Sequence, residues 1–322
     1  MKYYFAPMEG ITGYVYRRVH REFFPGMDKY FTPFVVANQT LKLKRREKKD
    51  VAPENNQGIY AVPQIMANKA EEFLWAAKEL GNLGYEEINL NLGCPAATVV
   101  SKKKGAGFLA YPEELDAFLD AVFSGMEGWG MKLSIKTRLG KDRLEEAQRL
   151  MDIYNQYPLY ELTIHPRVQK EFYKNKPHME AFEKAAVRSC HSLCYNGNLF
   201  SCRDYEQFTE TFPQSRFPQI GAVMLGRGLL ANPALVRQLQ GGHSLKGGEL
   251  KQFHDALYRA YGDTDLGAVN TLFKMKELWA YMGQMFSRGE RNVRKIRKAK
   301  NSLEYEAAVE KLFADCELDG SM

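Results

Sequence analysis

The sequence predicts an α/β fold in which eight parallel strands alternate with helices and close into a barrel, followed by a small bundle of helices. Three observations favour this fold. Short apolar segments recur with amphipathic stretches between them, polar residues collect where these segments end, and the alternation stops after about residue 240. Alternating strands and helices are typical of a parallel sheet, and eight such units close a (β/α)8 TIM barrel.

Eight segments have the length and apolar composition of buried strands. They cover residues 3–6, 30–35, 61–65, 87–91, 132–136, 161–165, 192–195 and 222–225. Amphipathic stretches lie between several of them and predict helices over residues 70–80, 112–126, 144–154, 179–189 and 203–212. Residues 1–240 are therefore expected to form one barrel domain.

An open, doubly wound sheet also alternates strands with helices and is the alternative architecture. The first segment is followed by Pro7, Met8, Glu9 and Gly10, and not by the Gly-x-Gly-x-x-Gly turn of a dinucleotide-binding fold. Polar residues also stand at the ends of the segments, where barrel enzymes build their sites. These residues are Gln64, Asn91, Lys136, His165 and Asn196.

The pattern changes after residue 240. Residues 241–248 are rich in glycine and read as a linker. Beyond them, helical periodicity covers residues 249–261, 268–286, 290–299 and 302–314, with no strand between them. Residues 241–322 are therefore expected to form a second domain, a small helical bundle.

Composition limits the location of the protein and the classes of partner. The formal charge of +6 is moderate, so a nucleic-acid surface would have to be local. An odd number of cysteines, five, and a start without an apolar signal segment predict a reduced, cytoplasmic protein. No apolar run approaches the roughly 20 residues that cross a bilayer, so no membrane contact is expected. Cys190, Cys194 and Cys202 lack the matching pair of a zinc site, so no metal is expected.

Three basic clusters, residues 42–49, 102–104 and 288–300, favour an anionic partner. A single charge run is commonly a solvated surface. Here two of the clusters follow predicted barrel strands, and the third lies in the added helical domain. Phosphate neutralisation by such clusters gives salt-sensitive binding with little dependence on sequence. The residues predicted to bind such a substrate are Lys102, Lys103, Lys104, Arg291, Arg294, Arg297 and Lys298.

Cys94 stands at the end of the fourth predicted strand, between Gly93 and Pro95. A lone cysteine is commonly a small buried apolar residue. Its place at a strand end, followed by a basic loop that contains Gly105 and Gly107, favours a catalytic thiol instead. A thiol can act as acid, base or nucleophile, and its position alone does not decide among these.

Two cations and a histidine follow on the next two strands. Lys136 and Arg138 alternate out of the fifth strand, so both side chains can point to the same side. Semi-buried cations there would favour an electron-rich or anionic ligand. His165 ends the sixth strand; a histidine at such a place is either a hydrogen-bonded structural residue or part of the same site.

The last two strands end in glycine-bearing turns. Asn196, Gly197 and Asn198 follow the seventh strand, and Gly226 and Arg227 follow the eighth. Barrels commonly bind a phosphate at these two loops, where backbone N–H groups can approach its oxygens. The alternative is a pair of tight turns without a ligand.

With these motifs assembled, the chain resembles the tRNA-dihydrouridine synthases of the bacterial type, flavin enzymes that reduce uridine in tRNA. The resemblance extends over essentially the whole chain. It depends on the order and strand-end placement of residues 6–12, Gln64, residues 91–95, Gly105 to Gly107, residues 136–138, His165, Asn196, Gly197, Gly226 and Arg227.

The resemblance implies a TIM barrel that holds FMN at its C-terminal mouth and a helical domain that contacts tRNA. Cys94 would be the general acid, and Asn91 and Arg138 would face the uracil. Asn198, in the same turn as Asn196, is also expected to bind the cofactor. The residues expected to hold FMN are Pro7, Met8, Gln64, Lys136, His165, Asn196, Gly197, Asn198, Gly226 and Arg227.

The implied reaction is reduction of specific tRNA uridines to 5,6-dihydrouridine. Reduced FMN would deliver a hydride to C6 and Cys94 a proton to C5, with NADPH or NADH as the reductant. The target base would have to be unstacked to enter the pocket. A monomer is the expected state.

The chain departs from the usual family pattern after the first and sixth strands. Residues 13–17 retain only Arg17 of the usual motif, and Pro166, Arg167 and Val168 replace the residues expected after the histidine. These departures concern the choice of uridine. The alternatives are an FMN barrel acting on a free pyrimidine, as a dihydroorotate dehydrogenase does, and a non-catalytic RNA-binding barrel. The basic helical domain argues against the first, and Cys94 with the flavin-site residues argues against the second.

Overall fold

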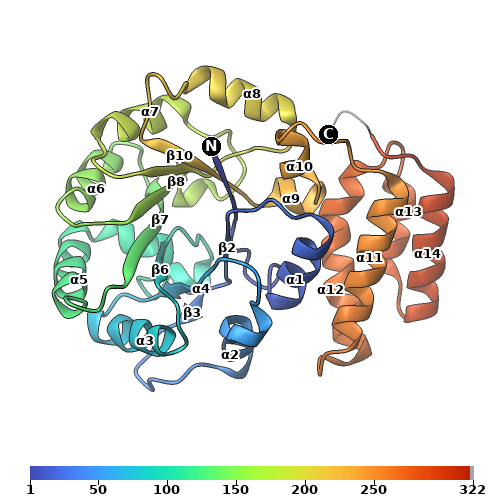
Figure 1. Ribbon diagram of the computed structural model, residues 1–322, viewed down its shortest axis with the longest axis horizontal. Coiled ribbons are helices and arrows are strands. Elements are labelled where there is room, and N and C mark those ends of the chain that lie inside the picture. The colour runs from blue at the N-terminus through green and yellow to red at the C-terminus, as the bar shows by residue number, and fades with distance from the viewer. Residues whose placement is uncertain (320–322) are drawn as a thin grey trace. The chain divides into compact units, whose positions relative to one another are not determined.

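The computed structural model describes residues 1–319, and its strands form one sheet that closes on itself (Figure 1). The order of strands is β3-β5-β6-β7-β8-β9-β10-β1-β2-β4. β2 and β3 are two parts of one extended segment, as are β4 and β5, and β2 pairs with β4 while β3 pairs with β5. The two ends of the order are therefore neighbours, and the ring has eight strand positions, as predicted. The strands are β1 (Lys2–Phe5), β2 (Lys29–Phe31), β3 (Val35–Val36), β4 (Ala61–Val62), β5 (Gln64–Met66), β6 (Glu87–Leu92), β7 (Lys132–Gly140), β8 (Glu161–Val168), β9 (Leu193–Tyr195) and β10 (Ile220–Leu225).

Prolines interrupt two of the eight strand positions. Pro33 lies between β2 and β3, and Pro63 lies between β4 and β5. A proline lacks the N–H that a ladder needs, so each strand breaks at that point and resumes beyond it. The sequence predicted one continuous strand at each position, and the structure divides both.

All five helices predicted within the barrel are present. They are α3 (Ala70–Asn82), α5 (Pro112–Gly125), α6 (Glu146–Tyr154), α7 (Met179–Arg188) and α8 (Cys202–Thr211). The structure adds short elements that the periodicity did not show. They are α1 (Tyr14–Phe23), α2 (Arg45–Val51), α4 (Ala97–Val100), α9 (Arg227–Ala231), α10 (Leu235–Leu239) and the 3-10 turns η1 (Pro53–Asn55), η2 (Gly105–Ala110) and η3 (Gln169–Glu171). A further 3-10 turn, η4 (Gly283–Met285), lies within the helix predicted over residues 268–286.

The chain divides into two compact units. The first contains Met1–Pro7, Asp28–Asn198 and Thr209–Met224, and the second contains Met8–Met27, Leu199–Phe208 and the chain from Leu225 onward. The units are thus interleaved along the sequence. The functional division at residue 240, into a catalytic and an RNA-binding domain, stays a prediction.

Four helices in the second unit match those predicted after the linker. They are α11 (Gly247–Gly262), α12 (Gly267–Met282), α13 (Glu290–Lys298) and α14 (Ser302–Asp315). Their core contains a buried polar contact, in which Tyr305 OH accepts from Trp279 Nε1 at 2.9 Å and lies 2.7 Å from His254 Nε2. α1 belongs to this unit, and its Tyr16 packs edge to face on Phe253 of α11, with 5.9 Å between ring centroids.

The barrel interior has an apolar part and a polar part. The apolar part contains Tyr4, Ala6, Phe31, Val62, Cys194, Ala222 and Met224, from β1, β2, β4, β9 and β10. Opposite faces of β6 differ in character: Ile88, Leu90 and Leu92 are fully buried on one, while Glu87, Asn89 and Asn91 alternate with them. The inward side chains of β6 and β7 are polar and hydrogen-bond to one another, as in the contact of 3.0 Å between Asn89 Nδ2 and Ser134 Oγ.

A buried ion cluster closes the amino end of this polar part. Lys29 Nζ lies 2.8 Å from Glu87 Oε2 and 3.8 Å from Glu161 Oε1. Tyr4 OH donates to Glu161 Oε2 at 2.8 Å. Burial raises the pKa of Glu161 above its usual range, and Lys29 opposes that rise. One ammonium therefore compensates two carboxylates that have little access to water.

Replacing Lys29 by methionine should lower the free energy of unfolding by about 3–5 kcal/mol, because two buried carboxylates lose the ammonium that lies 2.8 and 3.8 Å from them. Urea unfolding at pH 7 measures this loss. The matched control is Lys103→Met, since the Lys103–Glu114 pair is exposed on both sides and should contribute less than about 1 kcal/mol. Equal losses in the two variants would contradict the importance of the cluster.

Candidate active site at the carboxyl ends of the strands

The strand-end residues predicted from the sequence come together within the first unit. The register aligns Asn91 of β6 with Lys136 of β7, and Arg138 of β7 with His165 of β8. Gln64 of the neighbouring strand β5 accepts from Asn91 at 2.6 Å. Side chains at the carboxyl ends of parallel strands meet at one end of a barrel, which is where barrel enzymes bind their substrates.

Cys94 lies in a turn that Asn91 holds. Asn91 Oδ1 accepts from the backbone N–H of Gly93 at 3.1 Å and from that of Cys94 at 2.9 Å. The side-chain oxygen of an Asn commonly caps a turn two and three residues on in this manner. The thiol is half-buried, so it stays accessible at the end of β6.

Gly105 lies against the back of the Cys94 turn. Its φ of +55° is in the left-handed region, and a Cβ there would come within 2.9 Å of the Cys94 carbonyl oxygen. The N–H of Ala106 donates to that same oxygen at 3.0 Å. The glycine is therefore needed for close packing and for its backbone conformation, and the loop that it begins supports the thiol.

Arg138 ties the Cys94 turn to the loop after β8. Its Nε donates to Gly93 O at 2.9 Å, and its Nη1 donates to Val168 O and Phe172 O at 3.1 and 3.0 Å. Nη2 is buried and makes no hydrogen bond to the described residues, although the Tyr173 ring lies beside the guanidinium. A buried donor without an acceptor costs free energy, which a ligand oxygen would recover.

Lys136 is a half-buried cation without a hydrogen bond or an ion pair among the described residues. Burial, and then the charge of Arg138, lower its pKa to about 8. The ammonium is thus mostly charged at neutral pH and faces no carboxylate partner. Such a group suits an electron-rich or anionic ligand.

His165 is held by Arg167, a residue that the sequence reasoning did not place in the site. Arg167 Nη1 lies 2.7 Å from His165 Nε2, and Nη2 donates to Asn198 Oδ1 at 3.1 Å. A guanidinium can only donate, so Nε2 accepts and the neutral ring carries its proton on Nδ1. The spacing of two residues on one strand was the signal that would have found Arg167, because it puts both side chains on one face.

Tyr173 is a second residue that the predicted site did not include. Its ring lies 5.8 Å from that of His165 and 5.4 Å from the guanidinium carbon of Arg138. It is 44% exposed, and its neighbour Phe172 has a φ of +52°. The loop after β8 therefore carries an aromatic side chain next to two predicted site residues.

Residues in the turn after β9 make close contacts with their neighbours in the barrel. Asn196 Nδ2 donates to Met224 O at 2.8 Å and so fastens the turn to β10. A Cβ on Gly197 would collide with the Tyr195 hydroxyl, at 1.9 Å. Both residues are in the predicted place, and both are constrained by neighbours in the first unit.

The three lysines after Cys94 differ in their surroundings. Lys104 Nζ donates to Ala37 O at 2.7 Å, and Lys103 Nζ donates to Glu114 at 3.0 Å. Lys102 is exposed, and its ammonium has no partner among the described residues. Of the three, Lys102 is the one whose charge is free for a phosphate.

The remaining predicted cofactor-binding residues divide between the two units. Pro7 ends the first segment of the barrel unit, and Met8 begins the second unit, where Met8 O accepts from the N–H of Ile11 and of Thr12. Arg227 begins α9 directly after Gly226, and its guanidinium carbon lies 5.4 Å from the Phe200 ring. The sequence predicted a phosphate-type turn here, and the structure has a helix of five residues beginning at that turn.

α13 presents the strongest basic surface of the second unit. Arg291, Arg294, Arg297 and Lys298 are exposed, and none of them forms an ion pair with the described residues. Ile296 is the buried residue of this helix. The helix is thus anchored by its apolar side while the cations face the solvent. By contrast, residues 45–49, predicted as part of a basic loop, form the helix α2, in which Glu47 is buried.

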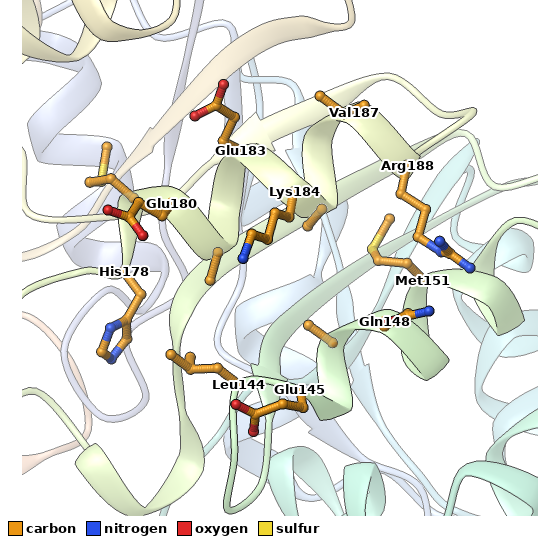
Figure 2. Close-up of a pocket in the computed structure, with 14 residues that line it drawn as sticks. Leu144, Glu145, Gln148, Met151, His178, Glu180, Glu183, Lys184, Val187 and Arg188 are labelled. Atoms are coloured by element: carbon orange, nitrogen blue, oxygen red, sulfur yellow. The ribbon is translucent and has the colours of Figure 1, made fainter.

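A separate pocket lies between α6 and α7 on the outer side of the barrel (Figure 2). Its volume is about 1170 Å³, and its walls combine apolar residues such as Met151 with charged ones such as Glu180 and Lys184. None of the predicted site residues lines it. The strand-end site is therefore not this pocket.

Residues 1–319 are the part of the chain that the structure describes. No helix in this part of the chain is long and apolar enough to cross a membrane. The same residues contain no group of three or more His, Cys, Asp or Glu side chains that could hold a metal ion.

The fold and the strand-end side chains define a barrel protein of the enzyme class, with a thiol and two cations gathered at the carboxyl ends of its strands. A sequence model described as dihydrouridine synthase (Dus) matches residues 4–319. The chain belongs to this family, which confirms the resemblance predicted from its motifs.

Named relatives agree with this assignment. A probable tRNA-dihydrouridine synthase from Staphylococcus aureus (strain MRSA252) is 26% identical over 285 residues, which cover 85% of this chain and 82% of the relative. The tRNA-dihydrouridine synthase B of Pasteurella multocida is 26% identical over 238 residues, which cover 74% of this chain and 68% of that protein.

Solved structures share the fold at low sequence identity. Histamine dehydrogenase from Rhizobium sp. 4-9 has a TM-score of 0.55 at 10% identity, with 89% of this chain and 51% of that chain covered. A morphinone reductase mutant in complex with tetrahydroNAD has a TM-score of 0.52 at 13% identity and covers 76% and 87%. A GH18 chitinase from Pseudoalteromonas aurantia has a TM-score of 0.50 at 10% identity and covers 75% and 99%. These similarities confirm the barrel and carry no further conclusion about chemistry.

The lowered pKa of Lys136 predicts a pH dependence of stability. Between pH 8 and about 10.5 the unfolded lysine is protonated and the folded one is largely neutral, so the unfolded state binds more protons and stability rises with pH. Relative to Lys136→Met, the free energy of unfolding of the ligand-free protein should rise by up to about 1.4 kcal/mol per pH unit.

Urea unfolding at several pH values between 7 and 10.5 measures this difference. The matched control is Lys132→Met, which removes an exposed lysine at the start of the same strand. A difference between the wild type and Lys136→Met that stays constant from pH 7 to pH 10.5 would contradict the burial of the Lys136 ammonium.

Proposed function

We propose that this chain reduces specific uridines in tRNA to 5,6-dihydrouridine, with FMN as its bound cofactor and NADPH or NADH as the reductant. Membership of the dihydrouridine synthase family supports the reaction, and the names of the Staphylococcus and Pasteurella relatives support tRNA as the substrate. The observation that carries the proposal is the turn that holds Cys94 at the same barrel end as Lys136 and Arg138. The cytoplasmic location and the monomeric state stay predictions.

The side chains at the strand ends fit a flavin. Lys136 offers an ammonium without a partner among the described residues, and His165 carries its proton on Nδ1 because Arg167 occupies Nε2. An ammonium without a carboxylate partner suits an electron-rich ring or a phosphate. The residues that would hold FMN are Pro7, Met8, Gln64, Lys136, His165, Asn196, Gly197, Asn198, Gly226 and Arg227.

The chemistry that FMN supplies when bound is hydride transfer, here to C6 of the uracil ring. Cys94 gives its Sγ proton to C5, so the C5–C6 double bond is replaced by two new C–H bonds. The resulting thiolate regains a proton from water. Lys136 and Arg138 place positive charge near the turn, which stabilises negative charge that develops during the reaction.

Arg138 and Asn91 are the residues proposed to contact the uracil. The buried Nη2 of Arg138 is a donor that a carbonyl oxygen of the base can satisfy. Asn91 Oδ1 already accepts two backbone N–H groups, so its contribution to the base is the second hydrogen of Nδ2.

The basic face of α13 is proposed to hold the RNA. Its exposed arginines and lysine lack intramolecular ion pairs with the described residues, so they are available for phosphates. Lys102 adds a free cation in the loop after Cys94. A uridine inside folded RNA must leave its stack to reach the barrel, at a cost of a few kcal/mol that such contacts offset.

The proposed function is tested by incubating the purified protein with unmodified tRNA transcript and NADPH. The wild type should be yellow with an FMN spectrum and should form dihydrouridine, detected by mass spectrometry of the digested tRNA. Cys94→Ala should keep the flavin spectrum and lower the rate by at least about a hundredfold, because the proton donor is gone.

Cys190→Ala, which removes an exposed cysteine far along the sequence, is the control and should keep full activity. A colourless protein that cannot be reconstituted with FMN would contradict the flavin assignment. Unchanged turnover in Cys94→Ala would remove Cys94 from the mechanism.

Replacing the four α13 cations together, Arg291→Ala, Arg294→Ala, Arg297→Ala and Lys298→Ala, should weaken tRNA binding and flatten its salt dependence. Each lost phosphate contact lowers the slope of log Kd against log salt by about 0.7–0.9. Binding measured by filter retention between 50 and 300 mM salt gives this slope.

A variant with the same loss of charge in the barrel unit serves as control. It combines Lys78→Ala, Lys132→Ala, Arg149→Ala and Arg216→Ala, all at exposed positions. If both variants lose the same affinity, net charge and not the α13 surface governs binding.

A further inference from the structure

Both ends of the Asn91 side chain are engaged within the barrel unit. Oδ1 receives the N–H groups of Gly93 and Cys94, and Nδ2 donates to Gln64 Oε1 at 2.6 Å. Asn91 is only 7% exposed, so water competes weakly for these contacts. The amide therefore fixes the direction in which the chain leaves β6.

This anchor continues through the barrel interior. Gln64 Nε2 donates to Asn89 Oδ1 at 2.7 Å, Asn89 Nδ2 donates to Ser134 Oγ at 3.0 Å, and Ser134 Oγ lies 3.1 Å from Glu87 Oε1. Glu87 forms the buried ion pair with Lys29. We call this series the interior chain; its members are Asn91, Gln64, Asn89, Ser134, Glu87 and Lys29.

Every member of the interior chain is buried, and the three side-chain amides use both their donor and their acceptor ends. Rotating one amide would leave the next without its partner, and a buried polar group without a partner is costly. The orientation of Asn91 is thus determined by contacts that extend down to the ion cluster.

The carbonyl side of the Cys94 turn is held separately. Arg138 Nε donates to Gly93 O at 2.9 Å, and Ala106 N donates to Cys94 O at 3.0 Å. Asn91 accepts from the N–H groups of Gly93 and Cys94 in the same turn. Removing its oxygen would release one side of the turn while leaving the other side intact.

We propose that Asn91 is a positioning residue that holds Cys94 in place by tying its turn to the interior chain. This role does not require RNA and is separate from contact with the base. Its consequence for catalysis rests on the proposed function, in which Cys94 gives the proton to C5.

The test measures alkylation of Cys94 by iodoacetamide in the RNA-free protein, followed by mass spectrometry of the peptide that contains this cysteine. In Asn91→Ala the rate should rise at least threefold, because the released turn exposes the half-buried thiol. In Asn91→Ser it should lie between the rates of Asn91→Ala and of the wild type. A serine hydroxyl can accept the same backbone N–H groups but cannot reach Gln64 or a base.

Thr163→Val is the matched control, since it removes another buried inward hydroxyl, on β8, that is outside the interior chain. Its rate should equal that of the wild type. Circular dichroism and thermal unfolding identify any variant that fails to fold. An alkylation rate in folded Asn91→Ala at or below the wild-type rate overturns the proposal. So does an equal acceleration in Asn91→Ala and Asn91→Ser, because the acceptor oxygen would then be irrelevant.

Dihydrouridine formation measured on the same variants separates the two proposals. We expect the rate at saturating tRNA to fall about tenfold in Asn91→Ala and to recover in part in Asn91→Ser. If the wild type forms no dihydrouridine, the proposed function fails. The alkylation rates still decide whether Asn91 positions the thiol.

Discussion

The structure depends most on the way in which polar side chains inside the barrel satisfy one another. Burying amides and charges is costly unless each finds a partner, and apolar packing alone would tolerate several arrangements. Here Asn89 receives from Gln64 of β5 and donates to Ser134 of β7. The same residues are aligned in the backbone register of β6 with its two neighbours. The interior hydrogen bonds and the strand register therefore specify each other.

This mutual dependence explains why the candidate active site is built on strands and not on loops alone. Cys94 lies beyond the last residue of β6, yet its backbone is held by Asn91 from inside the barrel and by Ala106 from the returning loop. Gly105 makes that return possible, because any side chain would strike the Cys94 peptide. Contacts with the sheet therefore fix the position of Cys94, although this residue lies in a loop.

The sequence predicted the eight strand positions and the five barrel helices because their periodicity is strong and their ends are marked. It also predicted which residues stand at the strand ends, since order along the chain is enough for that. It did not show that β6 turns its polar face to the barrel, because both faces are buried and the apolar one is the more obvious.

The sequence did not predict contacts between residues that are far apart along the chain. Lys102, Lys103 and Lys104 look alike along the chain, and only the fold shows that Lys104 reaches Ala37, which is 67 residues away. The link of Arg167 to Asn198 likewise requires β8 and β9 to be neighbours. Along the chain Gly105 is only one residue of a basic loop, and the fold shows that its lack of a side chain allows close packing against Cys94.

The charged side chains inside the barrel are paired at the amino ends of the strands and lack carboxylate partners, among the described residues, at the carboxyl ends. This difference connects the stability of the fold with ligand binding. At the amino ends of the strands one lysine compensates two glutamates, so the cluster is satisfied within the fold. At the carboxyl ends Lys136 and Arg138 have no carboxylate partner among the described residues, and burial lowers the pKa of both. The ligand-free barrel therefore bears the cost of two partly desolvated cations. An anionic or electron-rich ligand relieves that cost, so its binding stabilises the fold through the same residues that bind it.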